Sequence, residues 1–284
     1  MGSAPGHRRR QGVDTVTSAL ALQVTLTESD LLMLADRLAI HDFPTVLAIR
    51  ATHATIEQRR IAGDRATRGL MSRNLIVAGD VQPDLVPLLK ALHRPDRELA
   101  MRLVTPDGTA RFTAVRRGSL NVLARRVGDD ISFRVLNGSV EMQDVASALV
   151  AGLPHIRPAD IEPVVAPLQE LSESLSGAYD STALADRIRL LGVESQAAML
   201  LGAAFASREA FAEIVHYALA DDVGRISRTP AAVAVFYTKR GRIVAAPSAS
   251  PSGQLWTTLK PASDHAVVQA IGRLVELSNQ EWGE

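Results

Sequence analysis

The sequence predicts an α+β fold with a quasi-two-fold arrangement, in which a central antiparallel β-sheet of two four-stranded meanders is flanked by helices. Two groups of four short runs alternate apolar and polar residues, as strands do. Most breaks between these runs are too short for a helical crossover, so neighbouring strands must be antiparallel. The order of helices and strands also repeats in the two halves of the 284 residues.

The first half begins with the alternating residues Leu22, Val24 and Leu26, which predict a strand, and Thr27 can cap the helix that follows. The apolar run 45–50 predicts a short buried strand, and a meander and a closing helix follow later. The predicted elements are strand 22–26, helix 28–38, strand 45–50, helices 55–75 and 83–92, strands 97–104, 110–117, 119–127 and 130–136, and helix 141–153.

The second half repeats this order after a linker marked by prolines between 154 and 167. Three helices are expected before the second meander, and one after it. The predicted elements are helices 165–176, 181–191 and 194–206, strands 208–219, 230–238, 242–248 and 254–260, and helix 263–277.

The repeat is also visible in individual residues. Arg97–Glu98 matches Arg208–Glu209 at an offset of 111, and Phe133 matches Trp256 at an offset of 123. We therefore expect a disordered basic tail over 1–20, followed by a single domain over 21–284. Its two quasi-repeated halves, about 21–155 and 156–284, would share a sheet or pack face to face.

Composition and motifs give no sign of catalytic chemistry. Acidic and basic residues balance at 31 each, which argues against non-specific nucleic-acid binding. There is no cysteine, no run of 18 apolar residues, and no nucleotide-binding, metalloprotease or serine-hydrolase motif. Ser263–Asp264–His265 has the residue types of a catalytic triad, but it is better explained as a helix cap. We expect no enzyme activity, no cofactor and no metal.

Arginine is concentrated in the first meander. Eight arginines and only four acidic residues lie between 97 and 134. These arginines could form a solvated outer face, or a protein-docking face, because arginine is enriched in interfaces and pairs with carboxylates.

Three segments resemble one known family. Residues 238–261 read TKRGRIVAAPSASPSGQLWTTLKP, and a helix ending in LVEL and then Trp282 follow. This closing segment resembles the C-terminal pattern of the EspG family, the chaperones associated with type VII (ESX) secretion in mycobacteria and related actinobacteria. The early segment 38–50 (LAIHDFPTVLAIR) and the segment 94–99 (RPDREL) are similar to the same family.

The resemblance implies a cytosolic, non-enzymatic chaperone that binds PE–PPE heterodimers at the PPE tip, keeps them soluble and directs them to their own secretion system. It implies contacts through the central sheet, the first meander loop and a helical bundle over about 165–206. We expect partner-binding residues in that loop and in the longer loop 221–229. They are Thr105, Pro106, Asp107, Gly108, Arg111, Asp221, Asp222 and Arg225.

Two other functions stay open at this point. The chain could be a structural or adaptor subunit of the secretion machinery, which would associate stably with itself or with other subunits. It could also be an enzyme whose active site is assembled from dispersed residues, in which case a deep pocket should hold a carboxylate or histidine with a shifted pKa.

Overall fold

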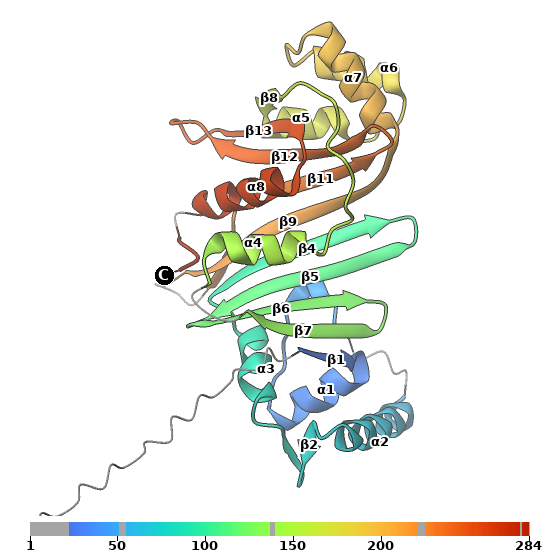
Figure 1. Cartoon of the computed structure of the whole chain (residues 1–284), viewed down its shortest axis with the longest axis vertical. Coiled ribbons are helices and arrows are strands. Elements are labelled where there is room, and N and C mark those ends of the chain that lie inside the picture. The colour runs from blue at the N-terminus through green and yellow to red at the C-terminus, as the bar shows by residue number, and fades with distance from the viewer. Residues whose placement is uncertain (1–22, 51–54, 137–139, 221–224, 279, 284) are drawn as a thin grey trace, which may run out of the picture.

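The computed structural model describes residues 23–50, 55–136, 140–220, 225–278 and 280–283. The expected tail over 1–20 lies outside these residues. Within them, the main feature is an 11-stranded antiparallel sheet that runs the length of the molecule (Figure 1). The predicted α+β class is confirmed, and the two meanders share one sheet.

The two halves of this sheet have the same strand arrangement when each is followed from its outer edge to the centre: one edge strand, then the four meander strands from last to first. It runs β1-β7-β6-β5-β4-β9-β11-β12-β13-β8, and β10 pairs with β9 beside this path. The two meanders meet where β4 pairs with β9, so a quasi-two-fold axis passes between these strands. The strands are β1 (Gln23–Thr27), β4 (Arg97–Thr105), β5 (Gly108–Arg117), β6 (Leu120–Val127), β7 (Asp130–Leu136), β8 (Val164–Pro167), β9 (Arg208–Ala220), β10 (Arg225–Arg228), β11 (Val233–Thr238), β12 (Gly241–Ala249) and β13 (Leu255–Pro261).

Helices cover both faces of the sheet. The front face carries α4 (Met142–Val150) and α8 (Asp264–Glu276), which lie before the sheet in Figure 1. Two bundles cover the back face at opposite ends of the sheet. The first contains α1 (Glu28–Arg37), α2 (Ile56–Ser72) and α3 (Leu85–His93), and the second contains α5 (Leu168–Leu175), α6 (Ser181–Arg189) and α7 (Ser195–Ala206).

Strand alternation divides the core into three clusters. The front cluster spans both halves, because Met101 of β4 and Ile214 of β9 pack with α4 and α8. One back cluster joins the first bundle to β5, β6 and β7, and the other joins the second bundle to β12 and β13. The two back clusters do not merge, so the middle of the back face lies between the two bundles.

The predicted strand over 45–50 is wrong. Residues Thr45–Leu47 form a 3₁₀ turn, η1, that follows Pro44 and ends at Ala48, which has a left-handed backbone (φ 50°). Pro44 lacks an amide hydrogen and fixes φ, so this segment is poorly suited to a sheet ladder. Leu47 is fully buried, and Val46 and Ile49 partly buried, by packing on the back face rather than by strand pairing.

Four short strands were not predicted. Strand β8 (Val164–Pro167) takes up the start of the expected helix 165–176, and residues 225–228 of the expected loop 221–229 form strand β10. A small hairpin of β2 (Ile76–Val77) and β3 (Asp80–Val81) follows α2. Such pairings depend on a partner strand elsewhere, which periodicity over four or fewer residues does not reveal.

The repeat holds for the sheet as a whole but not for every predicted residue match. Arg102 pairs with Glu213, 111 positions later, at the centre of the molecule. The predicted match of Phe133 with Trp256 is wrong. Phe133 packs into the first back cluster. In β13, Thr257 and Leu259 face the second bundle at the back of the sheet. Because side chains alternate along a strand, Trp256 points to the front.

Candidate protein-binding groove on the back face

One row of paired residues crosses the back face from edge to edge and shows how the two halves differ. Successive partners in the ladders are Leu26, Ile131, Arg126, Arg111, Arg102, Glu213, Ala234, Ala245, Leu259 and Val164. Directly paired residues point to the same face, so these ten side chains share the back of the sheet. The two-fold relation makes Arg111 equivalent to Ala234 and Arg126 equivalent to Ala245.

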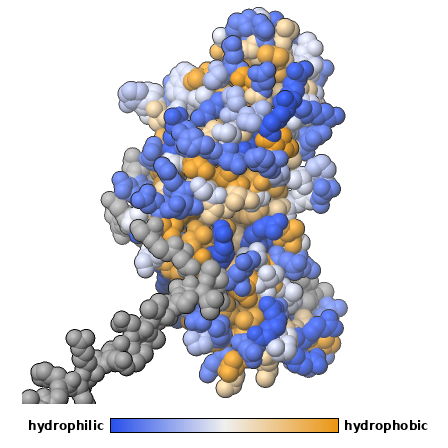
Figure 2. Space-filling model, in the orientation of Figure 1, coloured by the Kyte–Doolittle hydropathy of each residue, from blue (hydrophilic) through white to orange (hydrophobic). Residues whose placement is uncertain are grey.

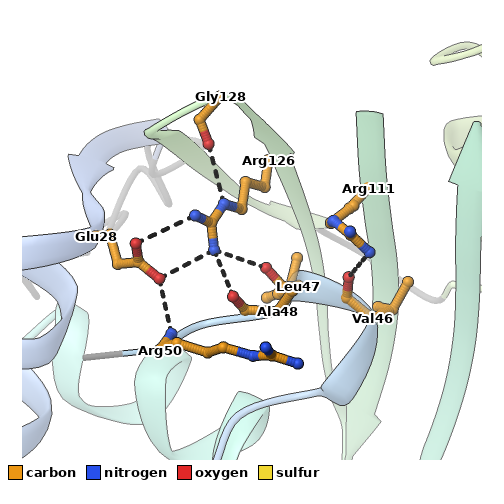
Figure 3. Close-up of polar contacts among 8 residues, drawn as sticks. All are labelled: Glu28, Val46, Leu47, Ala48, Arg50, Arg111, Arg126 and Gly128. Atoms are coloured by element: carbon orange, nitrogen blue, oxygen red, sulfur yellow. Dashed lines mark hydrogen bonds and ion pairs between the residues drawn. The ribbon is translucent and has the colours of Figure 1, made fainter. Parts of the chain in front are cut away.

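In the first half, the two arginines hold η1 against the sheet. The guanidinium of Arg126 donates hydrogen bonds to the carbonyl oxygens of Leu47 at 2.9 Å and Ala48 at 2.8 Å (Figure 3). Arg111 donates to the carbonyl oxygen of Val46 at 3.2 Å. These bonds satisfy carbonyl groups of a turn that has no ladder partner. Residues 45–48 therefore occupy the back face at the position of the two arginines.

An acidic side chain completes this cluster. Glu28, at the start of α1, lies 3.1 Å from the Arg126 guanidinium and accepts a hydrogen bond from the backbone N–H of Arg50 at 2.7 Å (Figure 3). Both charged side chains are mostly buried, at 14% and 12% exposure. A paired charge that also makes several hydrogen bonds is well suited to such a site. The cluster therefore serves the fold, and the Arg126 guanidinium is engaged within the molecule.

In the second half, the equivalent space is an open groove. Ala234 and Ala245 replace the two arginines, and the cavity above them has a volume of about 1420 Å³. Its lining is apolar at the sheet and at α5, with Phe211, Phe236 and Leu259 from strands and Leu168, Leu171 and Leu175 from the helix. Phe236 is fixed by an edge-to-face contact with Phe205 of α7, at 5.0 Å between ring centres.

Chain length explains why only one half is filled. In the first half, 18 residues (38–55) connect α1 to α2, and they include η1. In the second half, only five residues (176–180) connect α5 to α6. Five residues cannot place a further turn on the sheet, because they are needed to reverse the chain between the two helices. The groove is therefore open because the connection between α5 and α6 is too short to cover it.

Charged residues border the groove on both sides. Arg208 and Arg228 lie on the side of β9 and β10, and Glu170 and Glu173 lie on α5. Glu213 pairs with Arg102 at the centre of the row. Its carboxylate lies 3.5 Å from the Arg102 guanidinium and 4.0 Å from that of Arg228.

The predicted partner-binding residues are not brought together. Thr105, Pro106, Asp107 and Gly108 form the β4–β5 turn, in which the Thr105 hydroxyl donates to the Gly108 carbonyl at 3.2 Å. Asp221 and Asp222 lie outside the described residues. Arg225 pairs through its backbone with Ala220 at the start of β10, so it lies at the opposite end of β9 from the β4–β5 turn.

The β4–β5 turn still lies near the groove. Val104 pairs with Phe211, a groove residue, so the exposed Pro106–Asp107 tip projects beside the start of β9, where Arg208 lies. Sequence reasoning missed the groove residues themselves. Their alanines and phenylalanines resemble ordinary core residues, and no signal in the single sequence distinguishes them.

Most arginines of the first meander bind groups within the molecule. Arg97 and Arg116 donate to carbonyl oxygens of the C-terminal residues 281–283, and Arg117 donates to the carbonyl of Lys90 at 2.5 Å. Arg125 lies over the ring of Phe112, 5.7 Å from its centre. Of the predicted arginine-rich docking face, Arg102 on the back of the sheet and Arg134 on the front are the exposed arginines not used in these contacts.

Two buried titratable side chains belong to the central strands, Glu98 to β4 and His216 to β9. Burial raises the pKa of Glu98 to about 7, although the Thr113 hydroxyl, which donates to its carboxylate at 2.9 Å, opposes this shift. Burial, with a smaller effect from the Arg97 charge, lowers the pKa of His216 to about 4. Glu98 points to the back of the sheet and His216 to the front, so they do not form an acid–base pair. Across the described ranges, no three acidic or histidine side chains are grouped as metal ligands.

Comparisons with known proteins show the family of this chain. A sequence model described as the EspG family matches residues 27–273. The chain belongs to the EspG family. Relatives include the ESX-1 secretion-associated protein EspG1 of Mycobacterium tuberculosis strain H37Rv, 27% identical with 93% of this chain and 89% of that protein covered. The ESX-3 secretion-associated protein EspG3 of Mycolicibacterium smegmatis is also 27% identical, with 91% and 88% covered.

A solved EspG structure has the same fold. The M. tuberculosis type VII secretion chaperone EspG5, determined in complex with a PE25–PPE41 dimer, superposes with a TM-score of 0.76 over 93% of this chain and 98% of that chain, at 20% identity. The sequence-model match over residues 27–273 confirms the resemblance to the EspG family. Among its described helices, none is both long and apolar enough to span a membrane.

Proposed function

We propose that this EspG chain is a cytosolic type VII secretion chaperone that binds PE–PPE heterodimers at the PPE tip. It keeps them soluble and directs them to their own ESX system. Membership of the EspG family supports the class of function, and the complex of EspG5 with a PE–PPE dimer supports the class of partner. We also propose that the chain acts by binding alone and forms one folding domain over 21–284.

The open groove is the observation that carries this proposal. The first half covers its own back face with η1, but the second half leaves an apolar surface that includes the partly exposed Phe211, Phe236 and Leu168. A concave apolar surface with a few charged groups at its border is a common form of binding site. A chaperone of this kind works by covering the apolar tip of its cargo, and a standard interface buries on the order of 1,600 Å².

We also propose a role for part of the predicted site. The β4–β5 turn at Pro106–Asp107 would contact cargo that extends beyond the groove at the Arg208 end. Asp221, Asp222 and Arg225 would contact the cargo only if it extends along the whole length of β9. A strand of 13 residues is about 40 Å long.

The test is co-expression of the chain with PE–PPE heterodimers encoded in the same genome, followed by size-exclusion chromatography. Wild-type protein should elute with at least one heterodimer. Ala234→Arg puts into the groove an arginine like the one at the equivalent position of the first half, Arg111. This substitution should lower the affinity for the heterodimer at least 10-fold while the fold is kept.

Val77→Arg is a matched control, because Val77 is exposed (54%) on the distant β2 hairpin. It should bind like wild type. Equal binding by Ala234→Arg and Val77→Arg would exclude the groove, and failure of every heterodimer to co-elute would contradict the proposed function. Stable self-association without cargo would instead support the structural-subunit alternative.

A further inference from the structure

We infer that the groove selects cargo by charge polarity: the apolar tip must carry carboxylates on the side facing β9 and β10 and a cation on the side facing α5. This inference rests on the proposed function and specifies the partner chemistry of the same groove. The charged residues that border the groove would fix the orientation in which a cargo can dock.

The basic side has more positive charge than its acid can neutralise. Glu213 stands between Arg102 and Arg228, at 3.5 Å and 4.0 Å. Both distances exceed those of a close charge-assisted hydrogen bond, and all three side chains are between 39% and 54% exposed. In the described part of the chain, Glu213 is the only carboxylate paired with either guanidinium. Donor groups of both arginines are therefore available to a second carboxylate.

Arg208 extends this basic side to the other end of the groove. It begins β9, whereas Arg228 pairs with Tyr217 near the end of β9, so cations border the groove at both ends of the same strand. No ion pair of Arg208 is found among the described side chains. Arg111, by contrast, is engaged with the Val46 carbonyl and does not contribute.

The opposite side of the groove is acidic. Glu170 and Glu173 lie on α5, which packs on β13 and β8. Three inter-strand spacings separate β9 from β13, which is about 14 Å. Glu173 accepts a hydrogen bond from Gln169 at 3.0 Å, and neither carboxylate pairs with a cation in the residues that the structure describes. The two sides thus present opposite charges across an apolar floor.

This arrangement is confined to the back of the molecule. Figure 2 shows the front, where hydrophilic and apolar residues are interspersed and a band of apolar surface lies at mid-height.

Charge pairs at the border of an interface mainly affect association rate and the rejection of wrong partners, whereas the apolar floor supplies the affinity. The borders of the groove would therefore decide which heterodimer binds and in which direction.

The experiment uses the full chain and the PE–PPE heterodimer that co-elutes with it, with affinity and association rate measured at low and physiological salt. Arg228→Glu should lower the affinity at least 10-fold, mainly through association, and Glu170→Lys should lower it about 3-fold or more. Glu213→Gln should raise it about 3-fold, because it removes the internal competitor for both arginines.

Arg134→Glu is the matched control, since Arg134 is exposed on β7 and pairs with Leu123 on the front face. It should change affinity less than 2-fold. Thermal unfolding of each variant must stay near wild type. Equal binding by Arg228→Glu and Arg134→Glu, with wild-type binding intact, would overturn the charge inference and leave the proposed function standing. If no heterodimer binds the wild type, both are overturned.

Discussion

Arg126 illustrates how a single side chain can decide whether a surface is open or filled. It reaches the carboxylate of Glu28 and the carbonyls of Leu47, Ala48 and Gly128 from one strand position. Ala245 occupies the equivalent position in the other half and reaches none of these groups. The difference between a stabilised turn and a vacant groove thus follows from two Arg-to-Ala differences and a shorter connection.

Arg126→Ala should lower the free energy of unfolding by about 2–4 kcal/mol, because it leaves Glu28 and two carbonyl groups without their partner in a mostly buried site. Chemical denaturation measures this directly. Arg126→Lys should recover little, since an ammonium cannot make the divergent bonds of the guanidinium. A loss below 0.5 kcal/mol would show that η1 is held by apolar packing alone.

Glu98 predicts an unusual pH dependence of stability. Its folded pKa is raised to about 7 from 4.5, so between these values the folded state binds more protons than the unfolded state. The free energy of unfolding therefore falls as pH rises from 4.5 to 7, by up to about 3 kcal/mol. His216 acts in the opposite direction, because its lowered pKa makes stability rise with pH between 4 and 6.5.

Glu98→Gln should remove the first of these effects. The variant should be more stable than wild type at pH 8, and its stability should rise through pH 4–6.5, where the two groups offset each other in wild type. Urea denaturation at several pH values tests this. Parallel profiles for the variant and wild type would mean that Glu98 ionises normally in the folded protein.

At the scale of elements, the connections differ more than the strands do. The eight meander strands were predicted within about three residues, because each of them alternates for six residues or more. The segments β8, β10 and η1 were missed or assigned wrongly. Each is four residues or fewer, and its conformation is set by the strand or side chain against which it packs.

The C-terminal segment is an element that joins both halves. Trp282 is 2% exposed, its indole N–H donates to the Asn121 side chain of β6 at 3.1 Å, and its ring centre lies 6.3 Å from that of His216 in β9. Arg116 donates to the carbonyl oxygens of Trp282 and Gly283. The end of the chain therefore ties the first meander to the second on the front face.

Trp282→Ala should lower the free energy of unfolding by about 3–5 kcal/mol, through loss of a buried aromatic side chain and of the Asn121 hydrogen bond. Glu281→Ala is the control, because only the backbone of that exposed residue is used, and it should cost less than 0.5 kcal/mol. Similar stabilities for both variants would show that the segment is not part of the cooperative fold.

At the scale of the whole molecule, near-symmetry and its local failure together create the groove. The strand order is the same from both ends, and Arg102 and Glu213 meet at the centre. A fully symmetric molecule would have filled both back faces or left both open. The present one fills the first with residues 45–48 and leaves the second open, so a single groove results.

Residue order alone predicts the α+β class, the two meanders, the family resemblance and the absence of known catalytic motifs. These depend on periodicity, short turns and local motifs, which are properties of neighbouring residues. Contacts between distant segments instead set where the arginines point, make η1 a turn rather than a strand, and place Ala234 and Ala245 at the floor of a groove. The reason is physical: an arginine or alanine in an alternating run has the same local pattern whether it faces a turn, a cavity or solvent, and only the ladder register across ten strands shows which it meets.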